Sequence, residues 1–105
     1  MSYKWPDLDP NELDAYSVDW SRYLDGSDTI ASVTWLVNDF FMESYNTYNN
    51  TEGELMMLQP TNTETVATVR FTGGVNGTRY NVTCRITTVA GLIYEKDIYL
   101  KVREQ

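Results

Sequence analysis

Carboxylates near the start of the chain are the first residues whose types and spacing could support chemistry. Asp7, Asp9, Glu12 and Asp14 lie close together, and a second acidic turn spans residues 25–28. Such oxygen ligands suit a hard cation such as calcium, and paired carboxylates can also carry out acid–base catalysis. However, the spacing differs from that of an EF-hand loop, and no pair of acids stands out as catalytic. We therefore expect turns at both places and no metal site.

Cys84 is the single cysteine, and the chain has no histidine. Without an imidazole, the usual general base that activates a serine or cysteine nucleophile is missing. One thiol also forms neither an intrachain disulfide nor a zinc site built from several thiolates. Because Cys84 alternates in phase with Val82 and Ile86, it is predicted to be a buried packing residue. The sequence predicts no catalytic residues, no cofactor and no enzymatic activity.

Composition and charge limit the fold and the partners. The chain has 105 residues, of which 42% are hydrophobic and 13% are aromatic, enough for the core of one domain. The formal net charge of −7 disfavours nucleic acid and anionic membranes as partners. Apolar runs are shorter than a membrane span, and the N-terminus lacks a signal-peptide core. We therefore expect a single domain whose direct partner is neither nucleic acid nor an anionic membrane.

The first half of the chain shows the alternation of apolar and polar residues that is typical of strands. Strands are predicted over residues 16–20 and 29–37, joined by a tight hairpin connection at Asp25 and Gly26. The second strand is expected to bury Ala31, Val33, Trp35 and Val37. Residues 55–58 are predicted to form a short strand that ends at Gln59 and Pro60, because proline cannot donate to a ladder.

The second half continues the same pattern. Residues 65–72 are predicted to direct Ala67, Val69 and Phe71 inward, and Tyr80, Val82, Cys84 and Ile86 share one face of a later strand. The final strand places Tyr94, Ile98, Leu100 and Val102 on one side, with Lys96 interrupting that apolar face. Residues 89–92 reverse the chain. The last two strands are therefore expected to form a hairpin.

About six to eight strands, separated by frequent turn signals, favour an all-β, immunoglobulin-like antiparallel β-sandwich over a closed barrel. Trp35 lies on an early inner strand, where such sandwiches often bury a tryptophan, and Tyr80 enters its strand as a tyrosine corner does. We assign residues 1–13 to an N-terminal arm and residues 14–105 to the sandwich domain.

Aromatic residues and methionines are interspersed with asparagines in an irregular stretch at residues 38–63. Residues of these types make adaptable contact surfaces, although some could instead close one end of the sandwich. Trp5 raises the same alternative: the residue before a proline is extended, so Trp5 could cap the sandwich or dock on a neighbouring subunit. The predicted interaction residues are Trp5, Phe40, Phe41, Tyr45, Tyr48, Met56 and Met57.

Charge is distributed unevenly along the chain. Residues 1–64 hold twelve acids and two bases, a formal charge of −10, whereas residues 65–105 hold three acids and six bases, a charge of +3. The acidic half could meet a basic partner surface, and Arg70, Arg79 and Arg85 could meet acidic ones.

Several short motifs resemble a family of small phage virion proteins called fiber-tail adaptors. In the front half these are Trp5-Pro6, Asp9-Pro10-Asn11-Glu12, Tyr16-Ser17-Val18-Asp19-Trp20, Leu24-Asp25-Gly26, Asp28-Thr29-Ile30 and Ser32-Val33-Thr34-Trp35. In the back half they are Thr68-Val69-Arg70-Phe71-Thr72-Gly73-Gly74, Gly77-Thr78-Arg79-Tyr80-Asn81-Val82-Thr83, Arg85-Ile86-Thr87-Thr88 and Gly91. The resemblance implies an immunoglobulin-like sandwich without enzymatic activity, present in many copies on the virion.

The resulting functional hypothesis is a phage structural protein that joins tail or portal components to fibers. Its partners would be other virion proteins of the portal, tail, fiber or capsid, with no nucleic acid and no membrane. Its place would be the tail or head–tail region of the virion, with the capsid surface as the other possibility. Two alternatives stay open: a capsid decoration (cement) protein, and a carbohydrate-binding module, since exposed aromatic side chains on β-sandwiches can stack on sugars.

Overall fold

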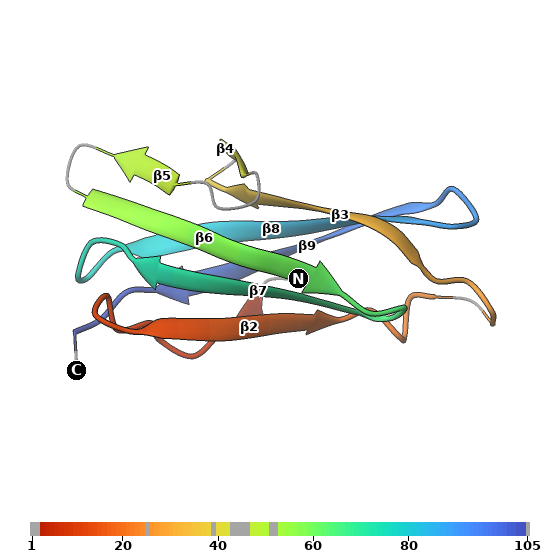
Figure 1. The fold of residues 1–105 in the computed structure, drawn as a ribbon, viewed down its shortest axis with the longest axis horizontal. Helices are drawn as coiled ribbons and strands as arrows, with labels where there is room; N and C mark the ends of the chain where they lie inside the picture. The colour runs from red at the N-terminus through yellow and green to blue at the C-terminus, as the bar shows by residue number, and fades with distance from the viewer. Residues whose placement is uncertain (1–2, 25, 39, 43–46, 51–52, 105) are drawn as a thin grey trace.

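Two β-sheets pack face to face as a sandwich, which confirms the predicted all-β fold (Figure 1). The computed structural model describes residues 3–24, 26–38, 40–42, 47–50 and 53–104. The strands found in this part of the chain are β1 (Tyr3–Lys4), β2 (Leu13–Asp19), β3 (Ile30–Val37), β4 (Phe40–Met42), β5 (Thr47–Asn50), β6 (Gly53–Asn62), β7 (Val66–Gly73), β8 (Arg79–Thr88) and β9 (Ile93–Lys101).

The order of the strands is that of an immunoglobulin-type sandwich. One sheet has the order β1-β9-β8-β3-β4, and the other has the order β2-β7-β6-β5. The strands β2, β7 and β6 occupy the places of immunoglobulin strands B, E and D, while β3, β8 and β9 occupy those of C, F and G. Among the described strands, β1 runs parallel to β9 and the other pairings are antiparallel. The predicted hairpin of the last two strands is confirmed as β8 and β9.

The core consists of the side chains on the inner faces of the two sheets. Trp35 is 2% exposed and Tyr80 is fully buried, as expected for the inner tryptophan and the tyrosine corner. The Tyr80 hydroxyl accepts a hydrogen bond of 3.0 Å from the backbone N–H of Val75. The predicted inward faces are buried as well: Ala67, Val69 and Phe71 on β7, and Val82, Cys84 and Ile86 on β8. Period-two alternation therefore identified the core faces of these strands correctly.

Lys96 interrupts the apolar pattern of β9 without disrupting the packing. Its ammonium nitrogen lies 5.0 Å from the centre of the Trp20 ring and 4.6 Å from that of Tyr23. A cation over an aromatic face is attracted by the negative potential of the ring. The charged residue therefore covers one end of the core and remains accessible to solvent.

The connection between β2 and β3 differs from the prediction. These two strands lie in different sheets, because β2 pairs with β7 and β3 pairs with β8. The chain between them therefore crosses from one sheet to the other, and the predicted hairpin at Asp25 and Gly26 is wrong. Turn residues indicate a reversal but not the sheet in which the next strand lies.

Two β-bulges account for the other differences. The β3–β8 register shifts between Ile30 and Ser32, and Ala31, predicted to be inward, is exposed. In β6 the strand continues through Pro60 rather than ending there, and its register shifts between Leu58 and Thr61. Gln59 adopts a positive φ of 48° in this bulge. Because a bulge leaves a residue outside the ladder, it accommodates a proline that has no N–H to donate.

Residues 3–8 of the segment predicted as an N-terminal arm run along β9 and its end. The backbone N–H of Trp5 donates to the carbonyl of Tyr99 at 3.0 Å, and the backbone N–H of Leu8 donates to the carbonyl of Lys101 at 2.8 Å. Leu8 is fully buried, so this segment contributes to the core as well as to the sheet edge.

Candidate interaction surface

Trp5 packs on its own domain. Its indole ring stacks on the Tyr16 ring with the centroids 4.8 Å apart, and its Nε1–H donates to the carbonyl of Ser17 at 3.3 Å. The side chain is half-buried against the core cluster. Within this chain Trp5 therefore packs against its own sandwich.

The two predicted methionines differ in exposure, although both belong to β6. Met57 is 1% exposed and forms part of the core, so the prediction that it serves as an interaction residue is corrected. Met56 is half-buried and points the other way, since neighbouring side chains of a strand face opposite sides. Met56 thus stays a candidate for contact.

The predicted aromatic residues lie around two edge strands. Phe40 and Phe41 belong to β4, where they pair with Val37 and Leu36, and Tyr48 belongs to β5. Both strands end the order of their sheets, and they lie on the same side of the sandwich (Figure 1). The side chains of these three residues, and all of Tyr45, lie outside the described residues. The backbone places Phe40, Phe41 and Tyr48 along one side of the molecule.

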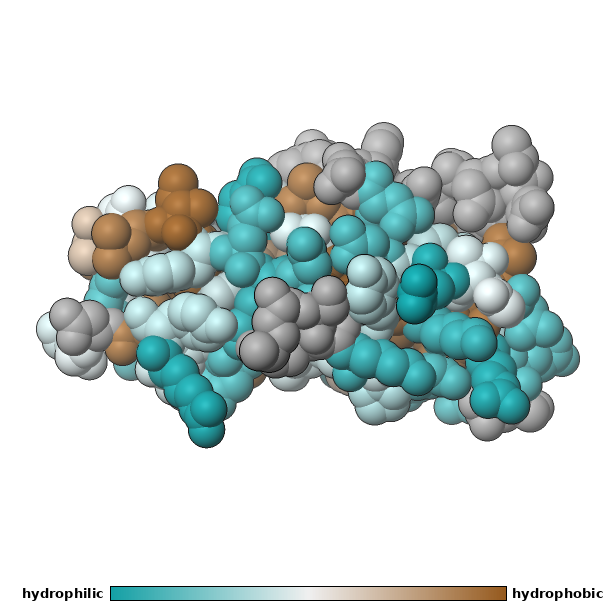
Figure 2. Space-filling view, turned by 180° about the vertical axis from the view of Figure 1, so that it is seen from behind, coloured by the Kyte–Doolittle hydropathy of each residue, from teal (hydrophilic) through white to brown (hydrophobic). Residues whose placement is uncertain are grey.

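An exposed hydrophobic cluster, which was not among the residues predicted to make contacts, lies at the β8–β9 turn. Val89, Leu92 and Ile93 are 70%, 48% and 64% exposed, and we name these residues the apolar tip. Figure 2 shows hydrophobic surface gathered at the end of the sandwich where this hairpin turns. The available signal was a reversal built from Val, Ala, Gly and Leu, where turns usually carry polar residues. Protein contacts commonly use such surfaces.

The apolar tip is held by hydrogen bonds from the β2–β3 connection. The carbonyl of Thr29 accepts from the N–H of Val89 at 2.9 Å, and the Asp28 carboxylate accepts from the N–H of Ala90 at 3.0 Å. Partial desolvation acts to raise the pKa of Asp28, but hydrogen bonds from Thr88, Ala90 and Thr29 outweigh it and lower that pKa. The hairpin is therefore preorganised, which reduces the entropy lost on binding.

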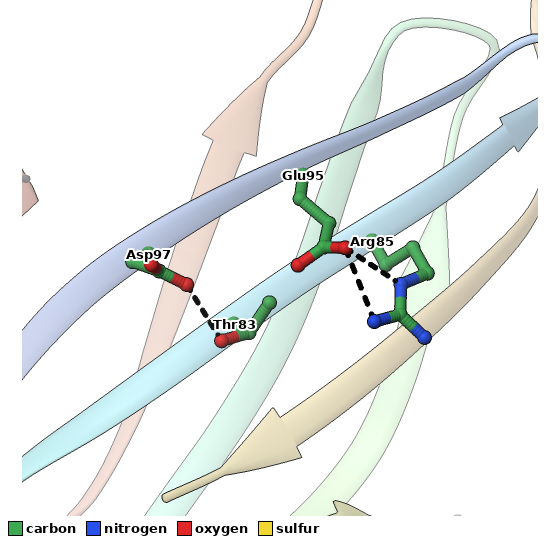
Figure 3. Close-up of polar contacts among 4 residues, drawn as sticks. All are labelled: Thr83, Arg85, Glu95 and Asp97. Atoms are coloured by element: carbon green, nitrogen blue, oxygen red, sulfur yellow. Dashed lines mark hydrogen bonds and ion pairs between the residues drawn. The ribbon is translucent and has the colours of Figure 1, made fainter. Parts of the chain in front are cut away.

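The outer face of the β8–β9 hairpin carries cross-strand polar pairs (Figure 3). The Thr83 hydroxyl donates to the Asp97 carboxylate at 2.7 Å. Arg85 donates from Nε to Glu95 Oε2 at 3.1 Å and forms an ion pair with the same oxygen through a second nitrogen, also at 3.1 Å. The charge of Arg85 is thus compensated within the chain.

The other two arginines predicted to meet acidic partners have different surroundings. Arg70 donates to the side-chain oxygen of Gln59 at 2.6 Å across β7 and β6. The guanidinium carbon of Arg79 lies 4.6 Å from the centre of the Tyr99 ring. Among the described residues, Arg79 forms no hydrogen bond or ion pair. The three arginines that look alike in the sequence are therefore not equivalent.

The residues first considered for chemistry have structural roles. Asp9 accepts a hydrogen bond from the N–H of Asn11 at 2.9 Å, which confirms the predicted turn. Cys84 is fully buried, and burial raises the pKa of its thiol to about 12, as expected for a packing residue.

Across the described ranges, no three acids or thiols converge where a metal ion could bind. The same ranges contain no helix that is long and apolar enough to cross a membrane.

Comparison with known proteins assigns the family. No curated protein matches the sequence significantly. A family model described as podophage GP4 fiber-tail adaptor protein gp77 matches residues 8–101, which include the strands from β2 to β9. This match confirms the resemblance carried by the motifs from Asp9 to Gly91. The chain belongs to the podophage GP4 fiber-tail adaptor protein gp77 family.

Proposed function

We propose that this chain is a non-enzymatic virion protein that joins tail or portal components to fibers. The observation that carries the proposal is the family match over residues 8–101, almost the whole chain. An adaptor needs surfaces for other proteins rather than a catalytic site, and the exposed apolar tip supports such a role. We propose further that the protein is present in several copies on the virion.

The apolar tip provides the first contact surface. Val89 and Ile93 are well over half exposed on a hairpin whose turn is fixed by Asp28 and Thr29. Burying such a side chain in a partner is worth roughly 1.5–3 kcal/mol before the costs of association. The tip would therefore bind an apolar recess on a neighbouring virion protein.

The edge strands β4 and β5 provide the second contact surface. We propose that Phe40, Phe41, Tyr45, Tyr48 and Met56 contact a partner from this side of the sandwich. Edge strands also carry unpaired backbone groups that a partner strand can use. The double variant F41A/Y48A tests this surface: it should fold but be incorporated poorly into virions. Full incorporation of the folded variant would remove this surface from the proposal.

Immunogold electron microscopy of intact phage particles, with an antibody raised against this domain, tests the function itself. Label at the tail or its collar is the expected result. Label over the head would instead identify a decoration protein and would overturn the proposal. No label, together with absence of the chain from the protein content of purified particles, would also overturn it. A glycan array tests the carbohydrate-binding alternative, and we expect it to remain blank.

A further inference from the structure

A concentration of positive charge lies at one end of the outer face of the sheet β1-β9-β8. Lys4, Arg79, Tyr99 and Lys101 line a shallow pocket of about 310 Å³, together with Gly77. We name these four side chains the basic pocket. Three of them are cations, although the whole chain carries a net charge of −7. None of the described residues that line this pocket is acidic.

The register of β8 and β9 places two like charges opposite each other at this end of the hairpin. Arg79 on β8 lies directly opposite Lys101 on β9, whereas Arg85 lies opposite Glu95. Like charges that face each other across an antiparallel pair destabilise it, while opposite charges stabilise it. The Arg85 side chain therefore has an opposite charge across the strand pair (Figure 3), whereas Arg79 faces a second cation there.

The surroundings of Arg79 leave its hydrogen-bonding edge available. The Tyr99 ring covers one face of the guanidinium at 4.6 Å, and within the described part of the chain none of its N–H groups has an acceptor. Lys101 likewise has no anionic partner among these residues, and Lys4 reaches only the Asp7 carboxylate, at 3.7 Å. A stacked guanidinium still presents its planar fork of N–H donors to a carboxylate.

We infer that the basic pocket binds the carboxylates of an acidic segment of a partner protein. Charge complementarity carries this inference, since the pocket supplies three cations on an otherwise acidic molecule. The net charge of −7 opposes a long polyanion such as nucleic acid, but it opposes a short acidic peptide less because salt screens distant charges. The inference rests on the proposed function, for which it names the chemistry of one partner.

The first experiment is a titration of the ¹⁵N-labelled chain with a capped hexaglutamate peptide, followed by NMR. We expect chemical-shift changes at Arg79, Tyr99 and Lys101, and none with capped hexaglutamine. The double variant R79A/K101A should bind hexaglutamate at least about tenfold more weakly. The matched control is R70A, which removes an exposed arginine from the other sheet and should change the affinity less than about twofold.

Several outcomes would overturn the inference. One is equal binding of hexaglutamate by the double variant, whose fold is checked by its urea midpoint. Another is a response of the Arg79 signals to inorganic phosphate but not to hexaglutamate, which would indicate a site for free anions. A third is a concentration-dependent shift without peptide at both the basic pocket and Asp7, Glu12 and Asp14. That result would identify a second copy of this chain as the occupant.

Incorporation into virions separates this inference from the proposed function. If the wild-type chain is found at the tail and the double variant is incorporated equally well, the pocket does not dock a partner but the adaptor role stands. If the wild-type chain is not found at the tail, the adaptor role fails whatever the pocket binds. Poor incorporation of the folded double variant, with R70A incorporated normally, supports both.

Discussion

Gly74 lies so close to Val102 that a β-carbon at residue 74 would be 2.6 Å from the Val102 Cγ2 atom. This close approach brings the loop after β7 against the end of β9, where Val102 is fully buried. Gly74 also has a φ of +92°, a conformation that side chains with a β-carbon rarely adopt. Both space and backbone conformation therefore require glycine here.

The substitution Gly74→Ala should lower the free energy of unfolding by about 2–4 kcal/mol, because it adds overpacking to backbone strain. The matched control is Gly91→Ala. Gly91 has a similar φ of +90° but open space around it, so only the strain of about 1–2 kcal/mol is expected. Urea denaturation measures both values, and equal costs would contradict the steric explanation.

Removing the hydroxyl should lower the free energy of unfolding at one buried tyrosine, Tyr80, but not at the other, Tyr16. Tyr80→Phe removes the acceptor for the Val75 N–H and should destabilise the fold by about 1 kcal/mol. In contrast, the buried Tyr16 hydroxyl has no hydrogen-bond partner among the described residues. Burial, followed by the charges of Asp14, Asp7 and Glu12, raises the Tyr16 pKa. Tyr16→Phe should therefore be neutral or slightly stabilising by urea denaturation; a loss as large as that of Tyr80→Phe would show that its hydroxyl is satisfied.

Polar substitutions at the apolar tip should separate stability from function. The variant V89T/I93T changes two exposed side chains, so its free energy of unfolding should stay within about 1 kcal/mol of wild type. Its incorporation into virions, measured by immunoblotting of purified particles, should fall sharply. Leu13→Thr is the control, since Leu13 is 51% exposed on β2, outside the tip. Normal incorporation of V89T/I93T would exclude the tip as a contact.

The Asp28 carboxylate should make the free energy of unfolding depend on pH in the acidic range. Its pKa is lowered in the fold by the hydrogen bonds that oppose desolvation, so the folded chain favours the ionised form. The resulting stabilisation is present above the unfolded pKa of about 3.9 and is lost as the pH falls through the lower, folded pKa. The stability difference between wild type and Asp28→Ala should thus be constant from about pH 5 to 7 and shrink below about pH 4.

Asp28→Asn serves as the control for this pH dependence, because its amide oxygen can still accept from the N–H of Ala90 without titrating. Urea denaturation across this pH range measures all three chains. A difference between wild type and Asp28→Ala that does not change with pH would contradict a role for the charge.

Much of the fold could be predicted because the relevant signals are local. Alternation with period two identified the buried faces of β7 and β8, since successive side chains of any strand point to opposite sides. The tryptophan at residue 35 and the tyrosine at residue 80 likewise indicated a sandwich of immunoglobulin type. Short motifs along the chain were enough to suggest the family that the match over residues 8–101 then established.

Pairing between distant segments could not be predicted. The bulge that exposes Ala31 and the one that admits Pro60 depend on the register of neighbouring strands, as does the crossing between β2 and β3. Val89 and Ile93 are exposed in the structure although both are apolar, so their residue types did not predict their exposure.

The two arginines on the outer face of β8 illustrate the difference between what the sequence determines and what the tertiary structure determines. By sequence alone, Arg79 and Arg85 are both outward-facing cations on one strand, and alternation determined that much. Only the tertiary structure decided that Glu95 lies opposite Arg85 and Lys101 opposite Arg79. The physical reason is that alternation is a property of a single strand, whereas charge compensation depends on which residue the register of the neighbouring strand places across from it.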